Sequence, residues 1–187
     1  MPAVTTQNEK PQNEINDLIG PMDPKIDNIV REKLVSARIN LLLNCSFFGN
    51  MATRLRLVNA DEWLATAATD GKNFYYNSRF IQKLRQGEIC FLFGHEVLHI
   101  CYDHFGRRGD RDPMIWNIAN DYCVNADLKK HRVGEFITSV PCLYDQKYDG
   151  QSSEEVYDDI LENAPKINIS KLMKSLLDDH LDGEDED

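Results

Sequence analysis

The sequence lacks an excess of positive charge and any long apolar run. It has 21 Lys and Arg against 31 Asp and Glu, which gives a formal net charge of −10. Binding through nucleic-acid phosphates needs a basic face, so this balance argues against a nucleic-acid partner. No run approaches the roughly 18 consecutive apolar residues of a membrane span, and the first residues lack the basic-then-apolar order of a secretory signal. We therefore expect no membrane partner.

The cysteines lack the pattern of a disulfide scaffold, since their number is odd and no C-x-x-C occurs. They are Cys45, Cys90, Cys101, Cys123 and Cys142, mostly among apolar neighbours. This pattern is typical of reduced, buried thiols and favours a cytoplasmic protein.

Length and composition predict one domain with a polar segment at each end. The 187 residues, 42% of them hydrophobic, suffice for a single core. We expect a disordered lead-in over residues 1–22, a domain over 23–165, and a C-terminal helix with an acidic tail over 166–187.

The apolar spacing predicts an α+β fold dominated by helices. Asp70-Gly71 lies between two short β-prone runs and is a strong hairpin signal. Ser78 is a plausible helix cap, Asp112-Pro113 is a typical helix start, and Ser152 with Glu155 forms a capping box. Residues 131–152 look irregular or extended. Helices are predicted over 23–44, 78–86, 88–105, 113–130, 152–163 and 170–181.

The stretch FGHEVLHICYDH, residues 93–104, holds three of the five histidines. Four-residue spacing places His95 and His99 on one helix face, so both imidazoles can reach one ion. The other interpretation is an apolar helix that happens to carry histidines. The residues that flank the histidines are uncharged, which favours the metal site, because two histidines and an ionised glutamate are costly to bury without partners.

The H-E-x-x-H pattern also provides a catalytic base. Zinc accepts imidazole nitrogens and, in catalytic sites, leaves one position open for water, whose pKa it lowers towards about 7. Glu96 projects beside the metal, where it can take the proton of that water and pass it to a leaving amine. The motif thus indicates zinc-dependent hydrolysis.

The third ligand has two main candidates. Asn117, Asp121 and Asn125 recur every four residues on the next helix. We favour Asp121 as the ligand, with the two asparagines hydrogen-bonded to ligands or packing the helices. His104 is the alternative, but continuing the helix would rotate it about 140° from His99, so a helix break would be needed. A thiolate from Cys101 or Cys123 is a weaker alternative.

The motifs GHEVLHICYDH and WNIANDYCVN, with the run ATDGKNFYYN before them and YDGQSSEEVYDDIL after, carry a resemblance. The chain resembles, over roughly residues 25–160, the metallopeptidase-like domains that often precede a von Willebrand factor A-like domain in bacterial and phage proteins. The resemblance implies a zincin-like fold, in which a small mixed or antiparallel sheet packs on the H-E-x-x-H helix. It implies zinc on His95 and His99, catalysis by Glu96, and family motif positions for His104 and Asp121.

The resemblance also implies partners and a location. Peptides or proteins are the implied substrates, in a bacterial cytoplasm or a phage-infected host. A von Willebrand factor A-like domain is an implied partner, for which this chain has no room. In such folds the strand before the active-site helix lines the cleft, so residues 72–77 are expected to bind the substrate backbone.

Two functions of different class follow. The first is a zinc metallopeptidase with Glu96 as general base. The second is a catalytically silent zincin-like module that binds metal and acts in protein binding or regulation. An intact Glu96 favours the first, since a purely structural site needs no carboxylate beside the metal.

Overall fold

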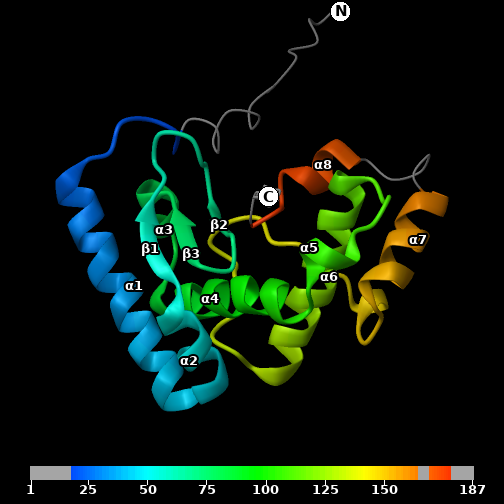
Figure 1. The fold of residues 1–187 in the computed structure, drawn as a ribbon, viewed down its shortest axis with the longest axis horizontal. Coiled ribbons are helices and arrows are strands. Elements are labelled where there is room, and N and C mark those ends of the chain that lie inside the picture. The colour runs from blue at the N-terminus through cyan, green and yellow to red at the C-terminus, as the bar shows by residue number, and fades with distance from the viewer. Residues whose placement is uncertain (1–17, 164–168, 178–187) are drawn as a thin grey trace, which may run out of the picture.

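The computed structural model describes residues 18–163 and 169–177 and shows an α+β fold built around one buried helix, α4 (Gln86–Cys101). A three-stranded sheet and helices α1 and α2 lie towards one end of α4, and α6 and α7 lie towards the other (Figure 1). The flanking helices are α1 (Pro24–Asn44), α2 (Ser46–Arg54), α6 (Pro113–His131) and α7 (Ser153–Asn163).

Helix α4 is buried around its whole circumference, as its apolar sequence predicts. Every residue from Glu88 to His99 is buried. The helix begins at Gln86, so Gly87 lies inside it and does not precede it as a break. Glu88 caps the first turn by accepting a hydrogen bond from the backbone N–H of Arg85 at 2.8 Å. The candidate histidines therefore sit on the most enclosed element of the fold.

The helix ends earlier than predicted, with a break at Asp103. The backbone of Asp103 is left-handed, with φ of 50°, and its carboxylate accepts the N–H of Gly106 at 3.3 Å. Gly106 permits this turn, because a Cβ there would lie 2.6 Å from that carboxylate. A short helix, α5 (His104–Arg107), follows. The turn redirects the chain so that His104 is buried.

The sheet is mixed, with strand order β1-β3-β2. Strands β2 (Ala67–Thr69) and β3 (Asn73–Tyr76) form the predicted antiparallel hairpin, while β1 (Arg56–Asn59) runs parallel to β3. The expectation that residues 72–77 bind a substrate backbone is wrong, because β3 is paired on both sides. The edge positions of the described sheet belong to β1 and β2.

The N-terminal half differs from the prediction at three places. Residues 46–54 form α2, so the alternating run at 52–58, which suggests extended chain, is helical at its start and becomes strand β1 from Arg56. Helix α3 (Ser78–Lys83) is capped by Asn77, whose side chain accepts the N–H of Phe80 at 3.0 Å. Ser78 instead donates its hydroxyl to buried Asp61. Leu18 belongs to the hydrophobic core, so packing begins before the predicted boundary at residue 23; residues 1–17 lie outside the described part.

The C-terminal half follows its capping signals. Asp112 accepts the N–H of Ile115 at 3.0 Å at the start of α6, and Ser152 and Glu155 form the predicted capping box before α7. Residues 132–152 are irregular apart from the short 3-10 helix η2 (Gln146–Tyr148). Helix α8 (Ile169–Met173) is shorter than the predicted 170–181, whose last residues lie outside the described part.

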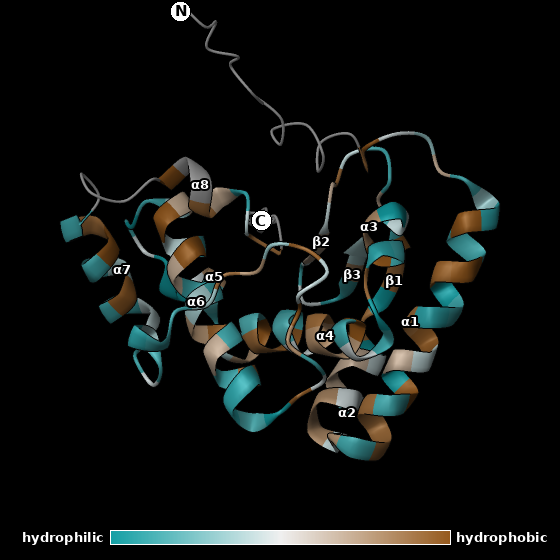
Figure 2. Cartoon of the chain, turned by 180° about the vertical axis from the view of Figure 1, so that it is seen from behind, coloured by the Kyte–Doolittle hydropathy of each residue, from teal (hydrophilic) through white to brown (hydrophobic). Residues whose placement is uncertain are grey.

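Hydrophilic and hydrophobic residues alternate along the outer helices, as Figure 2 shows for α1. Valine and leucine of α1 (Val30, Leu34, Leu41) point into the core, while Ile39 and Leu43 on the opposite side are exposed. Within the described ranges, no helix is both long enough and apolar enough to cross a membrane.

Candidate metal centre

His95 and His99 lie next to each other on the same face of the buried helix α4. Their spacing of four residues brings the rings together, with 4.5 Å between centroids and 3.0 Å between the two Nε2 atoms. Both side chains are completely buried. Two imidazole nitrogens at this separation repel each other unless a proton or a cation lies between them.

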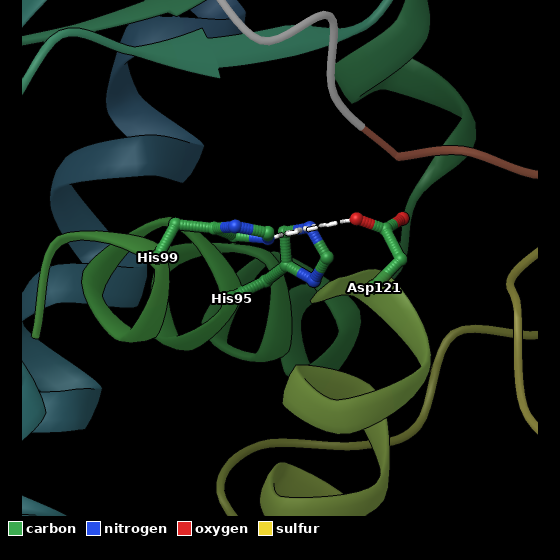
Figure 3. A group of neighbouring side chains, drawn as sticks. All are labelled: His95, His99 and Asp121. Carbon is green, nitrogen blue, oxygen red and sulfur yellow. Dashed lines mark hydrogen bonds and ion pairs between the residues drawn. The ribbon is translucent and has the colours of Figure 1, made fainter. Parts of the chain in front are cut away.

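Asp121 completes a triangle from the neighbouring helix α6 (Figure 3). Its Oδ1 lies 3.5 Å from Nε2 of His95 and 3.6 Å from Nε2 of His99. These are ion-pair distances, and Oδ1 accepts no hydrogen bond from any described residue although it is buried. The structure thus brings together the favoured three residues of the sequence prediction.

The triangle fits a zinc ion on geometric grounds. A tetrahedral ion with bonds of about 2.0–2.1 Å needs ligand atoms about 3.3 Å apart. The three separations here are 3.0, 3.5 and 3.6 Å, and the donors are two nitrogens and one carboxylate oxygen. Small movements would make them equal. The residues present therefore suit a metal ion with one coordination position to spare.

Close packing of α4 on α6 allows residues of both helices to meet at the triangle. A Cβ at Gly94 would lie 2.9 Å from Cδ2 of Leu128, so a larger residue before His95 would push that side chain away. The absence of a side chain lets α6 approach the histidine helix. Helices in such contact can offer ligands to one ion from both sides.

Asn125 determines which ring nitrogen of His95 carries the proton. Its Nδ2 donates to the backbone carbonyl of Leu143 at 2.9 Å, so its Oδ1 must be the atom that lies 2.9 Å from Nδ1 of His95. That Nδ1 therefore carries the proton, and neutral His95 presents a bare Nε2 to the triangle. Asn125, one of the two asparagines predicted to support the ligands, thus contacts His95, whereas Asn117 is only partly buried.

His104 lies on the far side of His99 from the triangle. The predicted condition for its approach, a helix break, is met at Asp103, but its Nδ1 reaches Nδ1 of His99 at 3.0 Å and not the Nε2 side. The indole of Trp116 donates to the His104 carbonyl at 2.8 Å and anchors the turn. His104 therefore contacts a candidate ligand through the nitrogen that faces away from the metal position.

Two further buried polar residues are sequence neighbours of the triangle residues. Glu96 follows His95 on α4 and is fully buried. Asn120 precedes Asp121 on α6, and neither of its amide atoms has a hydrogen-bond partner among the described residues. Sequence reasoning missed Asn120, because it falls outside the four-residue stripe of Asn117, Asp121 and Asn125. Only its burial distinguishes it.

The C-terminal segment covers Asp121. The backbone N–H of Leu177 donates to Oδ2 of Asp121 at 3.3 Å, and the Leu177 side chain is completely buried. The segment after α8 passes over the aspartate in Figure 3. This contact holds the carboxylate so that its other oxygen, Oδ1, faces the histidines.

The alternative thiolate ligands lie outside this cluster. Cys101 is exposed, and burial raises the pKa of Cys123 to about 11. The metal-competent group of described His, Cys, Asp and Glu residues consists of His95, His99 and Asp121. The geometry thus matches the predicted histidines and the favoured third residue.

Comparison with known proteins agrees with this geometry. No curated protein matches the chain, and no solved structure does. A family model described as "Putative metallopeptidase domain" matches residues 30–183, which include the whole triangle, Glu96 and His104. The chain belongs to this metallopeptidase-like domain family.

Proposed function

We propose that the protein is a zinc-dependent metallopeptidase of zincin-like fold, with His95, His99 and Asp121 as metal ligands. The observation that carries the proposal is the buried triangle of two Nε2 atoms and one carboxylate oxygen, with separations of 3.0–3.6 Å. Two imidazole Nε2 atoms and one carboxylate oxygen at such distances in a desolvated site suit a bound cation. Membership of the family supports peptide-bond hydrolysis as the reaction.

Glu96 is the general base in this proposal. When bound, zinc would supply a Lewis acid that brings the pKa of water towards about 7. The Glu96 carboxylate takes the proton of the attacking water and delivers it to the leaving amine nitrogen, so that the base is regenerated. Its complete burial keeps bulk water from that proton.

The substrate in this proposal is a peptide or protein that binds in an extended conformation. Strand β2 has an edge position in the described sheet, and its three residues are buried. The backbone groups of an edge strand can pair with an added peptide strand. We therefore move the expected substrate strand from residues 72–77 to β2, within a domain predicted over residues 23–165 whose core also includes Leu18 and Leu177.

A second candidate function is favoured by the burial of the site. His95, Glu96, His99 and Asp121 are all completely buried, and Leu177 contacts Asp121. A closed site of this kind suits a metal that stabilises the fold of a binding or regulatory module. In that case Glu96 would have no catalytic role.

Metal analysis combined with Glu96→Gln separates the two functions. The peptidase proposal expects about one zinc per chain in both proteins, and a loss of peptide-library cleavage of about 10²- to 10⁴-fold in Glu96→Gln. Zinc without Glu96-dependent cleavage would support the binding module. Purified protein that contains no zinc and takes up none would contradict both.

The ligand assignment has its own test. Asp121→Ala should lower zinc affinity more strongly than His104→Ala, because Asp121 faces both Nε2 atoms while His104 contacts only Nδ1 of His99. The reverse order would make His104 the ligand. Competition with a chromophoric chelator measures both affinities.

Location and partners complete the proposal. The five cysteines are free thiols, and burial raises the pKa of Cys90 to about 11. Unreactive reduced thiols support a cytoplasmic location. A von Willebrand factor A-like domain, if encoded elsewhere, is the proposed regulatory partner.

A further inference from the structure

We propose that His104 is a positioning residue that keeps Nδ1 of His99 hydrogen-bonded both before and after a metal binds. The inference rests on the proposed metal site and extends it to a residue outside the triangle. It is carried by a chain of contacts that runs from His95 through His99 and His104 to Ser153 at the start of α7.

The contacts form one continuous line of polar atoms. Nε2 of His95 lies 3.0 Å from Nε2 of His99, and Nδ1 of His99 lies 3.0 Å from Nδ1 of His104. Nε2 of His104 lies 3.2 Å from Oγ of Ser153. All four residues are 3% exposed or less, so water has little access to these atoms. These polar atoms therefore depend on protein partners and not on bulk water for their hydrogen bonds.

One end of the line has a fixed direction. Asn125 requires the proton of His95 to sit on Nδ1, so its Nε2 can only accept. Without a metal, His99 satisfies this acceptor by donating from its own Nε2. Its Nδ1 is then bare and accepts from Nδ1 of His104, whose bare Nε2 accepts from the hydroxyl of Ser153.

A metal at the triangle requires the opposite direction. Nε2 of His99 must then be bare, so its single proton moves to Nδ1 and donates to Nδ1 of His104. His104 carries its proton on Nε2 and donates to Oγ of Ser153. The Ser153 hydroxyl can turn to Cys123, with which it also forms a hydrogen bond. Each imidazole keeps one proton, and every bond of the line is retained.

The requirement at position 104 is a group that can either donate or accept. Imidazole meets it by changing tautomer, and an amide meets it by rotating its side chain. A carboxylate could only accept, and an aliphatic side chain could do neither. An aliphatic residue would remove the acceptor that His104 offers to the buried Nδ1–H of His99 when the metal is bound, which weakens binding.

The test compares His104→Leu and His104→Asn with the wild-type chain. His104→Leu should lower zinc affinity about 10- to 100-fold, as loss of a hydrogen bond to a ligand typically does. His104→Asn should restore it to within about threefold of wild type. Affinities come from chelator competition, and imidazole ¹³C and ¹⁵N shifts of His99 should show a change of protonated nitrogen on zinc binding. His131→Asn, at an exposed histidine, is the matched control.

The outcomes separate this inference from the proposed function. Wild-type affinity in folded His104→Leu would overturn it while leaving the metal site intact. A loss as large as in His99→Ala, without rescue by His104→Asn, would overturn it by making His104 a ligand. A wild-type chain that binds no zinc would instead remove the proposed function on which it rests.

A milder variant covers the case in which His104→Leu does not fold. Ser153→Ala removes the hydroxyl that contacts Nε2 of His104 and leaves the buried His104 imidazole in place. It should lower zinc affinity by up to about tenfold. An unchanged affinity in Ser153→Ala, together with an unchanged His99 tautomer on zinc binding, would overturn the inference.

Discussion

Helix α4 has a buried polar cluster towards each end, and the two clusters are satisfied in opposite ways. Near its start, Glu88 accepts hydrogen bonds from Arg85, from the backbone N–H groups of Thr138 and Ser139, and from the Ser139 hydroxyl. Towards its other end, two Nε2 atoms and Oδ1 of Asp121 converge, and that oxygen accepts no hydrogen bond from a described residue.

The difference shows how a structural carboxylate can be told from a candidate ligand. Burial alone would raise the pKa of Glu88, but hydrogen bonds from Arg85, Ser139 and backbone N–H groups outweigh it and hold that pKa well below its usual range. Glu88 thus joins α4 to the loop at 138–139. In the triangle, Oδ1 of Asp121 is buried beside two imidazole nitrogens and accepts no hydrogen bond from a described residue, an arrangement that suits a bound cation.

Glu88→Ala should produce the largest loss of stability. It leaves buried backbone donors at Thr138 and Ser139 without their acceptor. We therefore expect the free energy of unfolding to fall by about 2–4 kcal/mol. Urea denaturation measures this change. Zinc affinity should stay within about twofold in the folded protein, since additivity holds for separate sites. A loss of zinc binding in Glu88→Ala without a loss of stability would contradict the structural role given to Glu88.

Zinc should stabilise the other cluster by a similar amount. At a free concentration of 100 times the dissociation constant, binding to the folded state adds about 2.7 kcal/mol. For a chain of this size the melting temperature should rise by about 5–10 °C. Asp121→Ala should show almost no rise, and His131→Ala should behave as wild type. An equal rise in Asp121→Ala would place the zinc elsewhere.

Acid should weaken the Glu88 cluster in a predictable direction. Because the folded-state pKa of Glu88 is lowered, its contribution is fully present above the unfolded pKa of about 4.3 and is lost as the pH falls below it. The stability difference between wild type and Glu88→Gln should therefore shrink between about pH 5 and pH 3. Denaturation series at matched pH values test this, and a difference that grows in acid would contradict it.

The smallest effect is expected at the surface. Arg107 on α5 and Glu154 on α7 form an ion pair of 2.6 Å, with side chains 38% and 33% exposed. Exposed pairs of this kind contribute about 0–1 kcal/mol. Glu154→Gln should therefore change stability by less than about 1 kcal/mol, in contrast with Glu88→Ala. An effect as large as that of Glu88→Ala would show that burial does not separate the two kinds of carboxylate.

Local signals in the sequence predicted much of the fold and the centre of the site. The Asp112 cap, the capping box of Ser152 and Glu155, and the hairpin at Asp70-Gly71 depend on neighbouring residues and appear as expected. The pairing of His95 with His99 needs only helical spacing. The approach of Asp121 was inferred from a polar stripe on an apolar helix, which is also local information.

The misses share a dependence on distant residues. Helix α2 packs on α1 and α4 and includes Ala52–Arg54, the first residues of a run at 52–58 that alternates like a strand. Ser78 was predicted as a cap, but Asp61, 17 residues earlier, takes its hydroxyl and leaves the cap to Asn77. Strand β3, expected to bind the substrate backbone, is paired on both sides because β1 covers its second edge. In each case a contact made only in the folded chain decided the outcome.

The sequence by itself determined that two histidines and a glutamate share a buried helix, because helical geometry and apolar flanks are local properties. Only the tertiary structure decided what surrounds them. The left-handed turn at Asp103 sends His104 to the Nδ1 side of His99, and the approach of α6 brings Asp121 to the Nε2 side. Such separations of a few ångströms depend on how the helices pack, and no spacing along the chain specifies them.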